Sequence, residues 1–157
     1  MLAELELPTI RALEIGARDF NGGVRSLVEP MQPEWYVGID TAPGQGVDAI
    51  GDGKDYQPVA MPNLVLCTEV LEHTPHGRAV VANIGRVLER SGFALITCAT
   101  DPRAPHSGVD GNTVRVGEYY GNVPPADLSD WLREARLTVL TREVHTDRGD
   151  LYVWARR

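Results

Sequence analysis

The stretch Ala12-Leu13-Glu14-Ile15-Gly16-Ala17-Arg18-Asp19-Phe20-Asn21-Gly22-Gly23 decides the fold. An apolar run carries an acid near its end, glycines follow, and a helical pattern begins at Val24. We interpret this stretch as a strand that turns tightly into a helix. Such a turn brings backbone N–H groups and a carboxylate to the edge of a sheet, where ligands bind.

The composition is that of an ordinary globular protein. With 157 residues, 43% of them hydrophobic and 24% charged, the chain is expected to form one domain over 1–157 with a loose arm at 1–9. A formal charge of −7 disfavours nucleic acid as a partner, because binding requires neutralised phosphates. No apolar run approaches the ~20 residues that span a membrane. Cys67 and Cys98 lie in apolar runs, which is typical of buried, reduced thiols and predicts a cytoplasmic protein.

Strand and helix patterns alternate along the chain. Strands are expected at 9–15, 35–40, 47–50, 63–68, 93–99, 137–145 and 151–155, and helices at 24–28, 77–90 and 125–135. Pro30 should stop the first helix, and Asp127 or the residues just before it should cap the last. This alternation, which ends in an antiparallel hairpin, predicts an α/β fold with a mostly parallel sheet and helices on its faces.

Two connections are unusual. Only residues 41–46 separate the second and third expected strands, whereas a parallel crossover normally needs a dozen or more residues. Either the usual helix is deleted or the third strand is a short edge segment, and we favour the short edge. Residues 100–124 show little periodicity, and a loop of this length is usually functional or disordered.

The glycines and acids at the strand ends limit which classes of ligand can bind there. A dinucleotide fingerprint requires G-x-G-x-x-G, but here the glycines are Gly16, Gly22 and Gly23, so the tight pair is missing. Glu14 would also repel a pyrophosphate. No Gly-Lys-Ser/Thr follows the turn, so a phosphate-binding P-loop is equally disfavoured.

Five motifs follow one another in a fixed order. They are Glu14-x-Gly16 with Gly22-Gly23; Asp40 at a strand end; Gly51-Asp52-Gly53; Cys67-Thr68-Glu69-Val70-Leu71-Glu72-His73; and Arg86-Val87-Leu88 with Gly92. In order and spacing they resemble the class I S-adenosylmethionine-dependent methyltransferases of the small-molecule type. The resemblance runs from about Arg11 to the C-terminus, and it implies a doubly wound, seven-stranded Rossmann-like sheet.

The resemblance also implies S-adenosylmethionine as cofactor, which carries no phosphate and so tolerates an acid at the turn. Glu14 would orient the turn or meet the cofactor ammonium, and N–H groups near Gly16 and Ala17 would suit its carboxylate. Asp40 would accept both ribose hydroxyls, and Asp52 would accept from the adenine amino group. The expected cofactor-binding residues are Glu14, Gly16, Ala17, Asp40, Thr41, Asp52, Gly53, Thr68 and Glu69.

Besides the missing helix after the second expected strand, the sequence departs from the family pattern in two places. Arg18 stands where a second glycine is usual, so it must point away or contact the ligand. The helices that often precede the first strand and cap the pocket are absent, so we expect a minimal version of the fold. The site is then open, covered by residues 100–124, or covered by a second subunit in a homodimer or a larger complex.

Catalytic candidates are few. Methyl transfer needs a general base only where the nucleophile carries a proton. The available groups are His73, His106, Asp101 and the pair Tyr119-Tyr120, and we favour His106, with His73 next. Glu69 is either a ligand contact or a helix N-cap. His73 and His76 have H-x-x-H spacing, but no third ligand is obvious, so no metal is expected.

The sequence therefore predicts a methyltransferase that uses S-adenosylmethionine and acts on an unidentified acceptor. No Asn/Asp-Pro-Pro-Tyr motif follows the fourth strand, which disfavours an amide or adenine nitrogen and leaves a small molecule as the default acceptor. The alternative is a non-catalytic nucleotide-binding or cofactor-binding scaffold, or a subunit of a larger complex. A nicotinamide-dependent oxidoreductase is a distant third hypothesis.

Overall fold

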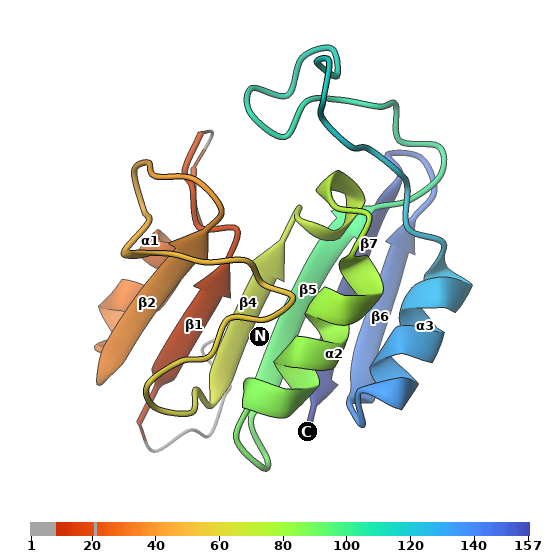
Figure 1. Ribbon diagram of the computed structural model, residues 1–157. Helices are drawn as coiled ribbons and strands as arrows, with labels where there is room; N and C mark the ends of the chain where they lie inside the picture. The colour runs from red at the N-terminus through yellow and green to blue at the C-terminus, as the bar shows by residue number, and fades with distance from the viewer. Residues whose placement is uncertain (1–8, 21) are drawn as a thin grey trace.

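The computed structural model describes residues 9–20 and 22–157, so most of the expected N-terminal arm lies outside the described residues. Seven strands form one sheet in the order β3-β2-β1-β4-β5-β7-β6 (Figure 1). The strands are β1 Arg11–Ile15, β2 Trp35–Asp40, β3 Ala49–Ile50, β4 Leu64–Thr68, β5 Phe93–Ala99, β6 Thr138–His145 and β7 Asp150–Arg156. All neighbours pair in parallel except β7, which is antiparallel to both β5 and β6. The predicted mostly parallel sheet with a closing hairpin is confirmed.

Helices lie on both faces of the sheet, as in a doubly wound fold. They are α1 Arg25–Val28, the 3-10 helices η2 Glu29–Met31 and η3 Leu71–His73, α2 Gly77–Val87 and α3 Pro125–Glu134. In Figure 1, α2 and α3 cover the front face, where they bury the larger apolar cluster with β1, β4 and β5. The smaller cluster lies on the other face, where α1 adds Val28 to Leu64, Leu66 and Trp154.

Helix α1 ends at Val28, before Pro30, as expected, and Pro30 lies in the first turn of the 3-10 helix η2 that follows, where its fixed φ is tolerated. Two other expected boundaries are wrong in detail. Helix α2 ends at Val87, and Leu88 is already extended. Asp127 is not a cap: α3 begins after Pro124 with no side-chain cap, and Asp127 lies in its first turn, where the helix dipole favours an acid.

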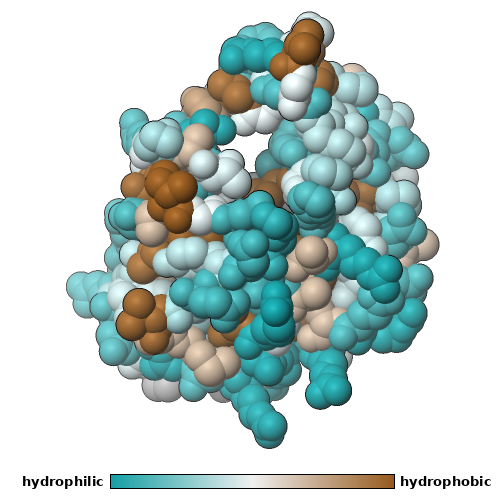
Figure 2. All heavy atoms as spheres, viewed as in Figure 1, coloured by the Kyte–Doolittle hydropathy of each residue, from teal (hydrophilic) through white to brown (hydrophobic). Residues whose placement is uncertain are grey.

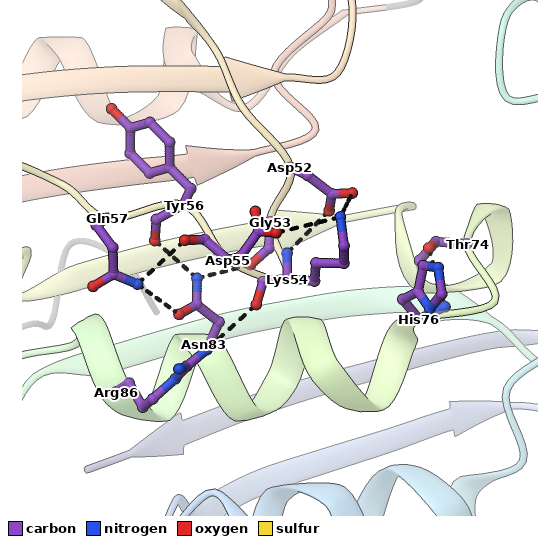
Figure 3. A network of polar contacts seen from close by, with 10 residues as sticks. All are labelled: Asp52, Gly53, Lys54, Asp55, Tyr56, Gln57, Thr74, His76, Asn83 and Arg86. Atoms are coloured by element: carbon purple, nitrogen blue, oxygen red, sulfur yellow. Dashed lines mark hydrogen bonds and ion pairs between the residues drawn. The ribbon is translucent and has the colours of Figure 1, made fainter.

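The connections on both sides of β3 contain no helix. Residues 41–48 cross from β2 to the two-residue strand β3 at the sheet edge. Both explanations offered from the sequence therefore hold: the usual crossover helix is missing, and the third strand is a short edge strand. The segment 51–63, which returns to β4, is held instead by α2. Asn83 donates from Nδ2 to the carbonyl oxygens of Gly53 and Tyr56, each at 2.9 Å (Figure 3). This bond pair fixes the loop that carries Asp52.

Two further expectations concern the core and the membrane. Cys67 and Cys98 are buried and not disulfide-bonded, as expected for core thiols, and burial raises the pKa of each. Among the described residues, no helix has the length and apolar character that a membrane span requires.

Candidate functional site

One large cavity opens at the carboxyl ends of β1, β2 and β4. After β1 the chain passes to α1 on one face of the sheet, and after β4 it passes to α2 on the other, so β1 and β4 flank the topological switch point. The cavity has a volume of about 1240 Å³, above the ~300–1,000 Å³ typical of small-molecule sites. Figure 2 shows the molecule hollowed beneath the overhanging loop 100–124. All of the expected cofactor-binding residues line this cavity, and so do His73 and His106.

Glu14 lies at the floor of the cavity and is only 3% exposed. Its Oε2 accepts a 2.7 Å hydrogen bond from the hydroxyl of Tyr36 on the neighbouring strand. Arg25 lies over the Tyr36 ring at 4.4 Å and pairs with Asp48. Burial raises the pKa of Glu14, and the Tyr36 hydrogen bond opposes that rise. The acid is thus held in place by Tyr36 and lines the cavity.

The glycine turn does not present the N–H groups that we expected. The backbone N–H groups of Gly16 and Ala17 both donate to the carbonyl oxygen of Ile39, each at 2.9 Å. They therefore tie β1 to β2 and are not available to a cofactor carboxylate. Gly16 has φ +78°, and a Cβ there would lie 2.2 Å from Val70, so only glycine fits this close turn.

Asp40 ends β2 beside the cavity. Its Oδ1 accepts from the N–H of Ala42 at 3.0 Å, which fixes the carboxylate in a local turn. Arg18 neither points away nor is distant: its Nε lies 3.8 Å from Oδ1, and its guanidinium stacks on Phe20. Within the described part of the chain no hydrogen bond reaches Oδ2, so this oxygen can accept from a ligand.

Asp52 follows β3 on the loop that Asn83 anchors (Figure 3). Its Oδ1 accepts from the backbone N–H of Lys54 at 3.0 Å, and its Oδ2 pairs with the Lys54 ammonium. Burial acts to raise the pKa of Asp52, but these Lys54 hydrogen bonds outweigh it and lower the pKa. Gly53 packs so tightly that a Cβ would lie 2.5 Å from Ile15, which keeps the loop against the strand ends.

Glu69 lies directly after β4 with φ +54°. It is not an N-cap, because the following 3-10 helix begins after Val70 without a side-chain cap. Its Oε1 accepts from the Thr97 hydroxyl at 2.8 Å, and its Oε2 lies 3.8 Å from Arg103. Arg103 also pairs with Asp150, so this carboxylate is fixed between a strand and the long loop.

The two candidate histidines face each other from different segments. The rings of His73 and His106 are 5.0 Å apart, and each also meets Tyr120 edge-on. Burial, with the nearby His106, lowers the pKa of His73 to about 4, so this imidazole is neutral at pH 7. His76, which the sequence pairs with His73, is exposed at the start of α2 and does not line the cavity, nor does Asp101.

Glu72 is the important residue that the sequence reasoning did not select. It is fully buried beneath the cavity, and its Oε1 accepts from the N–H of Ala99 at 3.1 Å. Burial and the neighbouring carboxylate of Glu69 raise the pKa of Glu72 well above its usual range. The signal was present in the sequence, since Glu72 follows Val70-Leu71 on a short segment directly after a buried strand.

The loop 100–124 forms the upper wall of the cavity and is organised by its own hydrogen bonds. Ser107 is buried and donates to Glu118 at 2.8 Å, and the backbone N–H of Arg115 donates to the same carboxylate. Gly108 packs directly on the His73 ring, where a Cβ would lie 3.0 Å away. Of the three possibilities considered from the sequence, an open site, a covering loop and a covering subunit, the structure shows the loop in place over the cavity.

Comparison with known proteins identifies the fold. No protein-family model matches the chain, and no curated protein matches it in sequence. An S-adenosylmethionine-dependent methyltransferase from Mesorhizobium loti superposes with a TM-score of 0.72 over 99% of this chain and 94% of that one, at 13% identity. This is the fold of class I S-adenosylmethionine-dependent methyltransferases.

Two further similar structures show the range of this methyltransferase fold. The 1,6-didemethyltoxoflavin-N1-methyltransferase of Burkholderia thailandensis, with bound 1,6-didemethyltoxoflavin and S-adenosylhomocysteine, has a TM-score of 0.67 over 95% of this chain and 71% of that one, at 16% identity. The [4+2]-cyclase SpnF has a TM-score of 0.68 over 95% and 75%, at 14% identity. At these identities the likeness establishes the fold, and function has to be argued from the site.

Proposed function

We propose that the protein is a methyltransferase that uses S-adenosylmethionine and transfers its methyl group to a small-molecule acceptor. The observation that carries this proposal is the series Glu14, Asp40 and Asp52, three acids that lie near or just after the ends of β1, β2 and β3 and line one cavity in this fold. When bound, the cofactor supplies an electrophilic methyl carbon on a sulfonium. The protein's task is then to position the acceptor and to exclude water.

The local chemistry fits a cofactor without phosphate. The N–H groups of Gly16 and Ala17 donate to the carbonyl oxygen of Ile39, so they are not free to bind an anion. Helix α1 has only four residues, so its N-terminus is not an anion-binding site either. The buried carboxylate of Glu14 would repel a pyrophosphate but can meet an ammonium. A dinucleotide is therefore disfavoured by the hydrogen bonding as well as by the glycine spacing.

Each end of the cofactor has a candidate partner. We assign the ribose hydroxyls to Asp40, whose Oδ2 can accept from them, and the adenine amino group to Asp52 on its anchored loop. Thr41 and Gly53 line the cavity beside these acids, and Thr68 and Glu69 line it at the end of β4. Contact with Asp52 requires that the carboxylate share its oxygens between Lys54 and the ligand.

The acceptor is assigned to the space between the strand ends and the loop 100–124, where His73 and His106 lie. His106 donates from Nδ1 to the carbonyl of Ala104 at 3.1 Å, because a carbonyl can only accept, and this leaves Nε2 with a lone pair. If the acceptor carries a proton, His106 is placed to take it, with His73 as the second candidate. The loop makes a covering subunit unnecessary, so we propose no partner at this face.

Location is proposed from the thiols alone. Cys67 and Cys98 are buried and unbonded, which suits a reducing compartment and supports a cytoplasmic protein.

Calorimetry with S-adenosylhomocysteine tests the cofactor assignment. Wild type should bind it, and Asp40→Ala should bind about 10–100-fold more weakly, since a lost hydrogen bond to a charged group is worth about 1.5–3 kcal/mol. Asp147→Ala is the matched control, because this acid lies in the exposed turn between β6 and β7. No binding by wild type, or equal binding by Asp40→Ala, would overturn the proposal.

A second function, a role other than methyl transfer, is favoured by one comparison: SpnF, which is named a [4+2]-cyclase and not a methyltransferase, is similar over 95% of this chain. The two functions separate experimentally. Binding of S-adenosylhomocysteine without methyl transfer from S-adenosylmethionine to any member of a panel of hydroxyl, amine and thiol acceptors would favour the role without methyl transfer.

A further inference from the structure

A buried carboxylate and two imidazoles converge beneath the loop 100–124. Ligand-type atoms of Glu72, His73 and His106 all lie within 4.8 Å of one another. Glu72 is 0% exposed, and its Oε2 has no hydrogen-bond partner within the described part of the chain. A buried oxygen without a partner costs about 1–3 kcal/mol, so a native structure normally supplies one.

Each of the two imidazoles also offers a ring nitrogen as a ligand atom. Nδ1 of His73 is buried and, among the described residues, makes no hydrogen bond. His106 donates from Nδ1 to the carbonyl oxygen of Ala104, and this bond fixes the tautomer whose Nε2 carries the lone pair. A histidine that binds a metal is usually held in this way, with its other ring nitrogen donating to a backbone carbonyl.

We propose that Glu72, His73 and His106 bind a divalent first-row transition-metal ion. Two imidazole nitrogens and one carboxylate oxygen suit Mn²⁺, Fe²⁺, Co²⁺ or Zn²⁺, whereas Ca²⁺ and Mg²⁺ prefer oxygen ligands alone. Three atoms bound to one ion at about 2.1 Å are at most about 4.2 Å apart. Small side-chain rotations therefore suffice to close the group around an ion.

The surroundings favour a cation at this place. Glu69 lies beside Glu72 and adds a second carboxylate, and Arg103 is shared between Oε2 of Glu69, at 3.8 Å, and Asp150. His73 and His106 both line the cavity, so an ion held by three protein ligands would keep coordination positions open toward it. In the proposed methyltransferase these positions would take an acceptor oxygen. Because the Nε2 lone pair of His106 would then bind the ion, His106 would hold the metal in place of acting as the base, a consequence that rests on the proposed function.

Metal binding is measured on the full chain without any cofactor. The protein is stripped with a chelator and titrated with Co²⁺, and the visible absorption of the bound ion is followed. Wild type should bind one equivalent. His106→Ala and Glu72→Gln should each weaken binding at least about tenfold, because even the loss of an outer partner of a metal ligand costs 10–100-fold.

His145→Ala is the matched control, since His145 forms the exposed pair with Glu143 on β6, away from the cavity. His106 lies on the loop and outside the apolar clusters, so its variant should fold, which circular dichroism verifies. Unaltered affinity in Glu72→Gln or in His106→Ala would overturn the proposal, and so would the absence of Co²⁺ binding by wild type at millimolar concentration. Because S-adenosylhomocysteine is not used, such a failure would leave the methyltransferase proposal standing.

Discussion

The hydroxyl of Tyr36 donates a 2.7 Å hydrogen bond to the buried carboxylate of Glu14 across the β1–β2 pair. This contact connects the floor of the cavity to an ion pair nearer the surface, because Arg25 stacks on Tyr36 and pairs with Asp48. Glu14, which lines the cavity, is therefore held by Tyr36, and Tyr36 packs against the smaller apolar cluster on the α1 side of the sheet. The network explains how a carboxylate is tolerated at the end of a buried strand.

Tyr36→Phe should destabilise the protein and loosen Glu14. The change removes one donor and keeps the ring on which Arg25 stacks. We expect the free energy of unfolding to fall by about 1–3 kcal/mol, the usual cost of leaving a buried acceptor unpaired. Urea denaturation measures it. Tyr56→Phe is the control, because no hydrogen bond to the Tyr56 hydroxyl is found among the described residues, and an equal loss in both variants would contradict the assignment.

Glu14→Gln should become more stable relative to wild type as the pH rises. Burial raises the pKa of Glu14, so the folded protein binds this proton more tightly than the unfolded chain does. The stabilising contribution of protonated Glu14 is complete below the ordinary carboxyl pKa and is lost as the pH rises through the folded-state pKa. The amide of the variant does not titrate, but its oxygen can still accept from Tyr36.

Urea denaturation of both proteins between pH 4 and pH 8 checks this sign. The difference in unfolding free energy, variant minus wild type, should increase with pH and then level off. Contributions from other titrating groups cancel in that difference. A difference that stays flat or decreases with pH would show that Glu14 is not penalised by burial.

Much of the cofactor side could be predicted from the sequence. Glu14, Asp40 and Asp52 lie at or after the ends of neighbouring parallel strands, and such ends share one edge of a sheet. The strand ranges follow from apolar runs, and β2 and β5 have the expected boundaries. Local pattern was enough here because each acid's place depends on the strand that carries it and on a simple topology.

The rest depends on contacts that no local pattern contains. The N–H groups of Gly16 and Ala17 are lost to Ile39 because of how β1 and β2 pair. His73 meets His106 and not His76 because the loop 100–124 folds back over η3. That path is set by internal hydrogen bonds of the loop, which the sequence does not reveal.

Asn83→Leu should release the loop that carries Asp52. Asn83 is buried, and its amide satisfies the carbonyl oxygens of Gly53 and Tyr56, which leucine cannot do. We expect a loss of about 1–3 kcal/mol in unfolding free energy and weaker binding of S-adenosylhomocysteine. Hydrogen exchange over residues 51–57 and calorimetry report the two effects. Gln57→Ala removes two 3.3 Å bonds, which the Gln57 amide donates to Oδ1 of Asn83 and to the carbonyl oxygen of Asp55, and should change both far less. Equal effects would refute the anchoring role.

Ser107→Ala should make the covering loop more mobile and leave the binding of the cofactor almost unchanged. The Ser107 hydroxyl donates to Glu118 at 2.8 Å and accepts from the N–H of Val109 at 3.1 Å, so the change removes two contacts that shape the loop. Hydrogen exchange over residues 105–119 should become faster. The affinity for S-adenosylhomocysteine should stay within about twofold, or ~0.4 kcal/mol, because Asp40 and Asp52 lie on other segments.

Ser129→Ala provides the control for Ser107→Ala, since Ser129 also donates to a neighbouring acceptor, the carbonyl of Pro125, but lies on α3 away from the cavity. It should leave exchange over 105–119 unchanged. Once an acceptor is found, Ser107→Ala should raise its KM more than it lowers kcat, because a looser wall weakens binding of the acceptor without removing His106. A large loss of S-adenosylhomocysteine affinity with unchanged loop exchange would mean that Ser107 supports the cofactor end and not the cover.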